Sequence, residues 1–287
     1  MSSPVFVVGC GRSGTTLLFD LLKRHPGLEP TTGHPDGEDH VGWIRHGGAM
    51  ISGLANPQGD TGHVGHHFCL YMDEHNASEE ICRSMHRYYR DEVLAGHSNK
   101  RVVNKCPHLS NKLRYVLKIF PDARIVHIIR DPVAMVASWV KVMQAVPDLV
   151  MYWPDSDFPC WWVLTGGDAP ARHDCFAREK RLYPGGGLSC FADYWAEVNR
   201  NIPRQLSDMP GRLLTIRYED LIAEPAGILR QVTDFCDLDP FEDIPVTIEK
   251  ERNALWRTLL KDEDIRTIRV RCADVAAEFG YPHVEFL

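Results

Sequence analysis

The chain opens on the stretch Val5-Phe6-Val7-Val8-Gly9-Cys10-Gly11-Arg12-Ser13-Gly14-Thr15-Thr16, which joins an apolar run to a glycine-rich turn. Four consecutive apolar residues, three of them valine, are typical of a strand that is buried on both faces of a parallel sheet. A helix should follow the turn directly, because leucines recur at helical spacing at Leu17, Leu18, Leu21 and Leu22. The stretch therefore predicts a strand, a binding loop at its carboxyl end and a helix.

The same alternation of strands and helices continues along the chain. Further apolar runs predict strands over Arg101–Val103, Arg124–Ile129 and Arg212–Ile216. Helical patterns follow at residues 113–120, at Pro132–Ala145 with Asp131 as the capping residue, and at 265–279 before Gly280. This order predicts an α/β fold in which helices flank a central parallel sheet.

Two long segments interrupt this alternation. Residues 30–67 are rich in glycine and histidine, and residues 147–190 hold several prolines and glycines together with Trp153, Trp161 and Trp162. Loops of this length are uncommon in compact domains unless they are functional or disordered, and clustered tryptophans argue against disorder. We expect one domain over residues 1–287, with both excursions on its substrate side. For 147–190, an additional structural subdomain is nearly as good an interpretation.

The composition excludes several classes of protein. The 287 residues are 44% hydrophobic and 25% charged, which is enough for a sizeable core and argues against general disorder. The net charge of −7 disfavours a non-specific nucleic-acid-binding surface, so we expect no nucleic-acid partner. No apolar stretch approaches the ~20 residues of a membrane span, so we expect no transmembrane segment. The nine cysteines are scattered without a Cys-x-x-Cys pair, which favours reduced thiols and a cytoplasmic location.

The glycine-rich turn resembles a Walker A phosphate loop, with Gly9 and Gly14 at its two glycine positions. Glycines let successive backbone N–H groups point inward and the helix N-terminus adds partial positive charge, so the turn should bind a phosphate. Thr15 stands where a Walker A loop has lysine, which argues against ordinary ATP or GTP hydrolysis, and Arg12 supplies a positive charge instead. The alternatives are a turn without a ligand and a P-loop kinase or NTPase with a degenerate loop.

A second phosphate signal follows the strand predicted at Arg124–Ile129. Arg130 ends that strand at the carboxyl edge, where open α/β sheets bind ligands, and Ser138 lies nearly two turns into the next helix. An arginine and a serine hydroxyl that converge on one point can bind a single phosphate. Together with the first loop, this motif suggests a nucleotide that carries phosphates at two separate places.

These residues resemble the motifs of the PAPS-dependent sulfotransferases, where PAPS is 3′-phosphoadenosine 5′-phosphosulfate. The turn resembles that family's 5′-phosphosulfate loop, which assigns donor binding to Gly11, Arg12, Ser13, Gly14, Thr15 and Thr16. Arg130 with Ser138 resembles the 3′-phosphate motif, and Tyr218 stands where the family often has a tyrosine near the adenine. The helix at 265–279 with Gly280-Tyr281 resembles the family's C-terminal tail. The resemblance implies a P-loop-type three-layer fold and transfer of a sulfuryl group from PAPS to a hydroxyl or an amine.

The resemblance also suggests which residues carry the reaction. Family members take the acceptor proton with a glutamate or a histidine downstream of the first helix, and here Glu38 is the first candidate and His40 the second. Lys105, at the end of the second predicted strand, and Arg12 are the cations expected to balance charge on the transferred group and the leaving phosphate. A lysine that merely pairs with a surface carboxylate is the alternative for Lys105.

Other features bear on cofactors and acceptors. A metal site is a minor alternative and no metal is expected, because the spacing of the candidate ligands fits no zinc template. The candidate ligands are His63, His66 and His67 with His34, Asp36 or His40. The acidic chain favours a small or medium metabolite, a glycolipid or a lipid as acceptor over a long anionic polysaccharide. A relative that binds the nucleotide without catalysis is a further alternative, and the sequence leaves the oligomeric state open.

Overall fold

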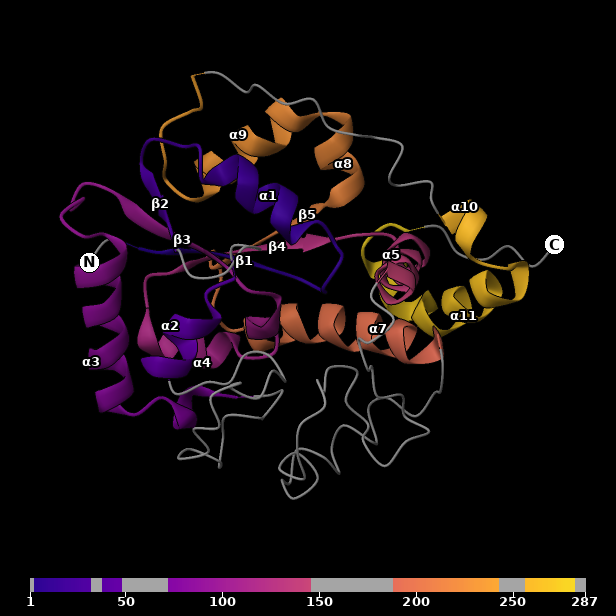
Figure 1. The fold of residues 1–287 in the computed structure, drawn as a ribbon, viewed down its shortest axis with the longest axis horizontal. Helices are drawn as coiled ribbons and strands as arrows, with labels where there is room; N and C mark the ends of the chain where they lie inside the picture. Colours follow the sequence, from indigo (N-terminus) through magenta and orange to yellow (C-terminus); the bar gives the residue numbers. More distant parts are fainter. Residues whose placement is uncertain (1–2, 32–37, 48–71, 146–187, 243–255, 282–287) are drawn as a thin grey trace.

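A five-stranded parallel sheet forms the centre of the molecule (Figure 1). The computed structural model describes residues 3–31, 38–47, 72–145, 188–242 and 256–281. Within these ranges the sheet has the order β2-β3-β1-β4-β5, with strands β1 (Val5–Val8), β2 (Leu28–Pro30), β3 (Arg101–Lys105), β4 (Arg124–Ile129) and β5 (Leu213–Arg217). All of these pairings are parallel, so the carboxyl ends of the strands meet at one edge of the sheet.

Helices cover both faces of the sheet (Figure 1). One face carries α1 (Thr15–Leu22), α8 (Tyr218–Ala223) and α9 (Pro225–Phe235). The opposite face carries α2 (His40–Arg45), α4 (Leu113–Ile119) and α7 (Leu188–Gln205), with α3 (Glu79–Tyr88) packed against α4. Beyond β4, three further helices pack together, namely α5 (Pro132–Ala145), α10 (Trp256–Leu259) and α11 (Asp262–Glu278). Short helical turns complete the description at Glu74–Asn76, Tyr89–Val93 and Pro107–Leu109.

Successive side chains of β1 point to opposite faces and enter two different cores. Val5 and Val7 belong to the core that includes α1, α8 and α9, whereas Phe6 and Val8 belong to the core that includes α4 and α7. All four side chains are fully buried, and such burial contributes about 1.5–3 kcal/mol for each large apolar side chain. The sheet thus lies between two helical layers, which confirms the predicted three-layer α/β fold.

The sequence pattern and the structure agree on most of the strands. The strands predicted at Val5–Val8 and Arg124–Ile129 are confirmed, and the strand that begins at Arg101 continues to Lys105. The last strand spans Leu213–Arg217, one residue later than predicted. The prediction was wrong to leave out β2, which has only three residues and ends in a proline that an edge strand tolerates.

The helix boundaries follow the capping signals. α5 begins at Pro132 as predicted, and the Asp131 carboxylate accepts a hydrogen bond from the Ala134 amide at 3.0 Å. α11 ends at Glu278, two residues before Gly280. Gly280 has a φ of 72°, the left-handed conformation in which glycine commonly follows a helix.

Several predictions fall on residues outside this description. Most of residues 30–67 and 147–190 lies there, and so do His34, Asp36, His63, His66 and His67; only the backbone of His40 is described. None of the helices in the described ranges combines the length and the apolar character that a bilayer span requires. The cysteines whose side chains are described are free thiols, namely Cys10, Cys82, Cys106, Cys236 and Cys272.

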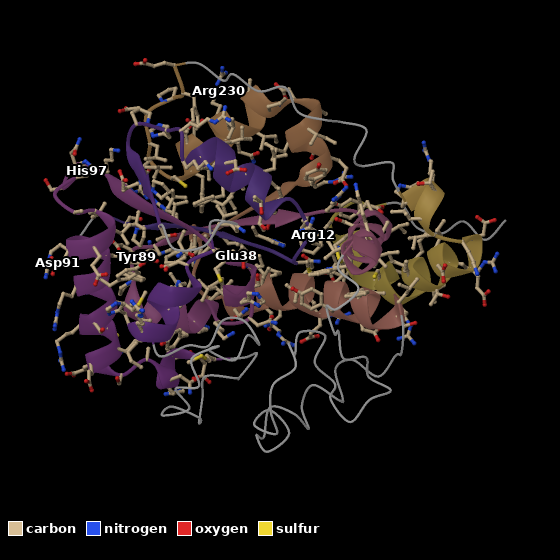
Figure 2. The ribbon with its side chains drawn as sticks, in the orientation of Figure 1. Arg12, Glu38, Tyr89, Asp91, His97 and Arg230 are labelled. Atoms are coloured by element: carbon tan, nitrogen blue, oxygen red, sulfur yellow. The ribbon has the colours of Figure 1, made fainter. Side chains whose placement is uncertain are left out.

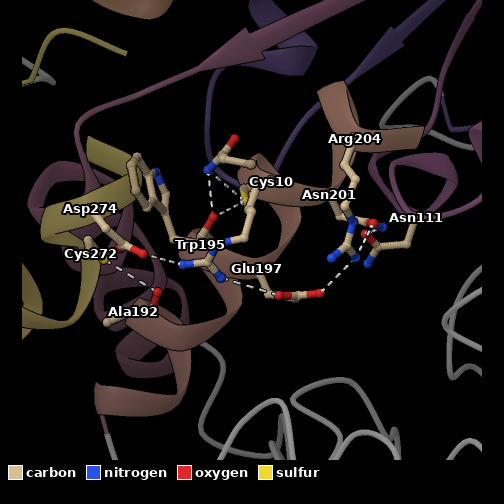
Figure 3. A network of polar contacts seen from close by, with 11 residues as sticks. Cys10, Asn111, Ala192, Trp195, Glu197, Asn201, Arg204, Cys272 and Asp274 are labelled. Atoms are coloured by element: carbon tan, nitrogen blue, oxygen red, sulfur yellow. Dashed lines mark hydrogen bonds and ion pairs between the residues drawn. The ribbon is translucent and has the colours of Figure 1, made fainter. Parts of the chain in front are cut away.

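A buried polar network ties the glycine-rich loop to α7 and to the sheet. The Asn199 amide nitrogen donates to the Trp195 carbonyl at 2.7 Å and lies 3.5 Å from the Cys10 sulfur. Figure 3 shows Cys10 and Trp195 in this network. The Asn199 oxygen, which can only accept, lies 2.9 Å from Nε2 of His127, and Nδ1 of the same ring lies 3.2 Å from the Thr215 hydroxyl. Burial lowers the pKa of His127 to about 4, so the ring is neutral in the folded protein at neutral pH.

This neutral histidine makes stability depend on pH. The unfolded chain protonates His127 near pH 6.5, whereas the folded protein does so only near pH 4. The contribution of neutral His127 to the free energy of unfolding is therefore fully present above pH 6.5. It falls by about 3 kcal/mol as the pH is lowered toward 4. Urea unfolding between pH 4 and 7.5 should show a free energy of unfolding that falls more steeply for the wild type than for His127→Gln. Parallel pH dependences for the two proteins would contradict this assignment.

Candidate functional site

The candidate site lies at the carboxyl edge of the sheet. The glycine-rich loop follows β1, Lys105 ends β3, Arg130 follows β4 and Arg217 ends β5. Figure 2 shows Arg12 beside α5, and Glu38 farther from that helix. Because the strands are parallel, this edge brings together residues that are far apart in the sequence.

Steric constraints shape the loop at two glycines. Gly9 has a φ of 146°, and a Cβ at this position would lie 2.3 Å from the Ile128 carbonyl oxygen. Gly14 has a φ of 98°, and a Cβ there would lie 2.3 Å from the Tyr218 ring. The Ser110 hydroxyl holds Gly9 through both backbone groups, since it accepts from the amide at 3.0 Å and donates to the carbonyl at 3.1 Å. The protein itself therefore fixes the shape of the loop.

The loop also presents the groups that bind an anion. α1 begins at Thr15 without a side-chain cap, which leaves amides of its first turn for a ligand. Ser13 is fully buried, and its hydroxyl has no hydrogen-bond partner among the described residues. A buried hydroxyl without a partner is unfavourable unless a ligand supplies one. Of the other loop residues, the Gly11 amide donates to the Tyr194 hydroxyl at 3.3 Å, and Thr16 is exposed. The uncapped amides of α1 and the Ser13 hydroxyl fit a phosphate or a sulfate as ligand.

The two predicted phosphate motifs contact each other. Arg12 has a left-handed φ of 71°, and its Nε donates to the Ser138 hydroxyl at 3.3 Å. Arg130 donates from Nη1 to the backbone carbonyl of Arg12 at 3.2 Å. The structure thus brings Arg12, Arg130 and Ser138 to one place between the loop and α5.

Tyr218 lies between these two motifs. The Arg130 guanidinium carbon is 4.4 Å from the centroid of the Tyr218 ring, a cation–π contact, and the edge of the same ring packs against Gly14. Arg130 is buried, and burial lowers the pKa of its guanidinium. Keeping a cation away from water is unfavourable, so this position favours an anionic ligand.

A buried ion pair forms the third part of the site. Lys105 is 1% exposed and its Nζ lies 2.8 Å from Oε1 of Glu38, whose side chain is 16% exposed. Glu38 also pairs with Lys105 through its backbone, as an isolated parallel bridge that extends the sheet edge. Lys105 thus pairs with a carboxylate, but not at the surface as in the alternative interpretation, because its own side chain and that of Glu38 both lie largely inside the protein.

His108 is a site residue that the sequence did not indicate. It lies in the helical turn at Pro107–Leu109, and its Nε2 is 3.9 Å from Oε2 of Glu38. The two carboxylate oxygens of Glu38 thus face two different nitrogen-bearing side chains. The turn at Pro107 sets this geometry, because it directs the third residue after Lys105 back toward the sheet edge.

The chain next to Glu38 is anchored by a second carboxylate. Asp39 is fully buried and accepts hydrogen bonds from the Gly42 amide and the Tyr88 hydroxyl, both at 2.9 Å. His40 follows as the first residue of α2, so its backbone lies two residues from Glu38. Among the described residues, no group of three or more His, Cys, Asp or Glu side chains is arranged to bind a metal ion.

Comparison with known proteins identifies the family of the chain. The sequence profile of the sulfotransferase family matches residues 4–153 and 171–243. The chain is 26% identical over 282 residues to the Mycobacterium bovis protein named omega-hydroxy-beta-dihydromenaquinone-9 sulfotransferase Stf3. The alignment covers 83% of this chain and 64% of that protein. The chain thus spans less than two thirds of the length of that curated relative.

Solved structures share the fold at low sequence identity. The sulfotransferase domain of the Synechococcus PCC 7002 olefin synthase superposes with a TM-score of 0.57 at 19% identity, over 99% of this chain and 98% of that one. The mouse sulfotransferase SULT7A1, described as complexed with PAP, gives a TM-score of 0.50 at 13% identity, over 96% and 84% of the two chains. With a profile match over most of its length, the chain belongs to the sulfotransferase family.

Proposed function

We propose that this protein transfers the sulfuryl group of PAPS to a hydroxyl or amine of an acceptor. The observation that carries the proposal is the contact of the glycine-rich loop with Arg130 and Ser138, beside the Glu38–Lys105 pair. Such a site suits a nucleotide with phosphates at two places. The description of the mouse structure as a complex with PAP supports the same donor class. A P-loop kinase is disfavoured because the loop has Thr15 in place of lysine.

In this proposal the two ends of the donor have separate binding groups. The Gly14 amide, the first amides of α1 and the Ser13 hydroxyl hold the 5′-phosphosulfate, while Gly11, whose amide donates to Tyr194, shapes the loop. Arg130 and Ser138 hold the 3′-phosphate, and the Tyr218 ring supports the Arg130 guanidinium through a cation–π contact. Arg12 connects the two sets of binding residues, because its backbone belongs to the loop and its side chain contacts Ser138.

Glu38 and Lys105 carry the proposed chemistry. An anionic donor competes with Glu38 for the Lys105 ammonium, and the released carboxylate can then take the acceptor proton. The acceptor oxygen or nitrogen forms a bond to sulfur as the bond from sulfur to the 5′-phosphate oxygen breaks, and the electron pair of that bond stays on the leaving phosphate. Lys105 and Arg12 balance the charge that develops on it. His40 is the second candidate for the base, and no metal takes part.

The proposed acceptor is a small or medium metabolite, a glycolipid or a lipid. The name of the mycobacterial relative specifies a hydroxylated menaquinone, which supports a lipid hydroxyl as one possible class of acceptor. We assign the substrate side to residues 30–67 and 147–190 of a single domain, and we place the protein in the cytoplasm without a nucleic-acid partner.

Removing the base should separate turnover from donor binding. We expect Glu38→Gln to lower turnover with labelled PAPS by 10²-fold or more, because the amide cannot take a proton. Its affinity for adenosine 3′,5′-bisphosphate should stay close to that of the wild type. The same substitution at His40 tests the second candidate, and the larger loss of turnover identifies the base. Wild-type turnover in Glu38→Gln would show that Glu38 is not the base.

The Ser13 hydroxyl should serve the ligand rather than the fold. We expect Ser13→Ala to leave the free energy of unfolding of the ligand-free protein within about 0.5 kcal/mol, because no described partner is lost. Its affinity for adenosine 3′,5′-bisphosphate should fall by about tenfold, as for a lost charge-assisted hydrogen bond. Urea unfolding and calorimetric titration measure the two quantities.

Ser110→Ala is the matched control for this prediction. It removes a serine hydroxyl that holds both backbone groups of Gly9, so it should lower the free energy of unfolding by about 1–3 kcal/mol. If Ser13→Ala destabilised the ligand-free protein as much and left nucleotide binding intact, the assignment of Ser13 to the phosphate would be wrong.

A further inference from the structure

Three consecutive residues at the junction of β5 and α8 contact the predicted 3′-phosphate motif or the C-terminal segment. Arg217 places its guanidinium carbon 4.5 Å from the centroid of the Tyr281 ring. Tyr218 lies against the Arg130 guanidinium. Glu219 accepts hydrogen bonds from two partners, the Asp131 amide at 3.1 Å and the Tyr281 hydroxyl at 2.9 Å. This junction therefore connects Tyr281, at the far end of the sequence, with Arg130.

One peptide group is held at both of its polar atoms. The carbonyl of Arg130 accepts a hydrogen bond from the Trp195 indole at 2.8 Å, and the amide of Asp131, in the same peptide, donates to Glu219. This peptide sets the direction in which the Arg130 side chain leaves the backbone. Rotation of the peptide would break both hydrogen bonds, so its orientation is fixed.

Tyr281 contacts both groups that hold this peptide. Its hydroxyl donates to Glu219, and its ring meets the Trp195 ring edge-on with the centroids 6.3 Å apart. The side chain is 4% exposed, and burial together with the Glu219 charge raises the pKa of its phenol, so the hydroxyl remains a donor at neutral pH. Removing that hydroxyl would leave the Glu219 carboxylate with one fewer partner and freer to leave the Asp131 amide.

We propose that Tyr281 is a positioning residue that gives the site its preference for nucleotides with a 3′-phosphate. Through Glu219 and Trp195 it fixes the peptide between Arg130 and Asp131, and so holds the Arg130 guanidinium where a 3′-phosphate would bind. This inference rests on the proposed function, in which Arg130 binds that phosphate. Arginine has many rotamers, so fixing it before binding spares the entropy that ordering it would otherwise cost.

The proposal is tested by two nucleotides that differ only in the 3′-phosphate. Calorimetric titration of the whole protein with adenosine 3′,5′-bisphosphate and with adenosine 5′-phosphate gives the preference as a ratio of affinities. In Tyr281→Phe this ratio should fall by roughly three- to tenfold, which corresponds to the net contribution of one ordinary intramolecular hydrogen bond. The affinity for adenosine 5′-phosphate itself should change by less than about twofold. A general loss of structure would instead weaken both nucleotides alike, so the ratio separates positioning from stability.

Tyr194→Phe is the matched control. Tyr194 is also buried, and its hydroxyl accepts from the Gly11 amide in the loop that would hold the 5′ group. Removing this hydroxyl should change the affinity for both nucleotides by the same factor and leave the ratio unchanged. Glu219→Gln should lower the ratio as Tyr281→Phe does, and adding Tyr281→Phe to it should lower the ratio little further, because both act through one contact.

The outcomes distinguish this inference from the proposed function. A wild type that prefers the bisphosphate, with a Tyr281→Phe variant that prefers it equally, would overturn the inference and leave the proposed function standing. A wild type without any preference for the bisphosphate would overturn both. A lower ratio in Tyr281→Phe and an unchanged ratio in Tyr194→Phe would support the positioning role.

Discussion

The hydrogen bond from the Arg130 guanidinium to the backbone carbonyl of Arg12 makes one site out of two motifs. The first motif follows β1 and the second follows the neighbouring strand β4, so a parallel sheet is what allows them to meet. The contact depends in turn on Gly9, which leaves room for the Ile128 carbonyl beside the loop. The aromatic ring of Tyr218 also contacts the Arg130 guanidinium. A binding site for two phosphate groups thus follows from sheet topology and a few close contacts.

An acidic chain can hold an anionic ligand when its cations are concentrated at one edge. The net charge is −7, yet Arg12, Arg130 and Lys105 gather at the carboxyl ends of the strands. Without a ligand, Lys105 is neutralised by Glu38 in a largely buried pair. Exchange of that partner for an anionic donor, as we propose, would link donor binding to the release of the base. Breaking a buried pair is unfavourable unless a new partner is supplied, so the carboxylate would be freed only when the donor is present.

The sequence predicted those parts of the fold that local pattern determines. β1, β4 and α5 carry strong periodicity or capping signals and appear as predicted, whereas the three-residue edge strand β2 has too little pattern to detect. The contact between Arg12 and Ser138 was not predicted, because the family resemblance assigns them to different ends of the donor, and their functional roles stay predictions. His108, Ser110 and Tyr281 could not be assigned to the site from sequence, because their positions depend on a helical turn and on tertiary contacts between segments far apart in the chain.

The most direct test of the account is the effect of nucleotides on thermal unfolding. A site that holds phosphates at two places should bind adenosine 3′,5′-bisphosphate, and at ~100-fold over its dissociation constant the ligand should stabilise the protein by about 2.7 kcal/mol. ATP with Mg²⁺, which lacks a 3′-phosphate, should stabilise it much less at the same concentration. Stabilisation by ATP with Mg²⁺ and none by the bisphosphate would contradict the account.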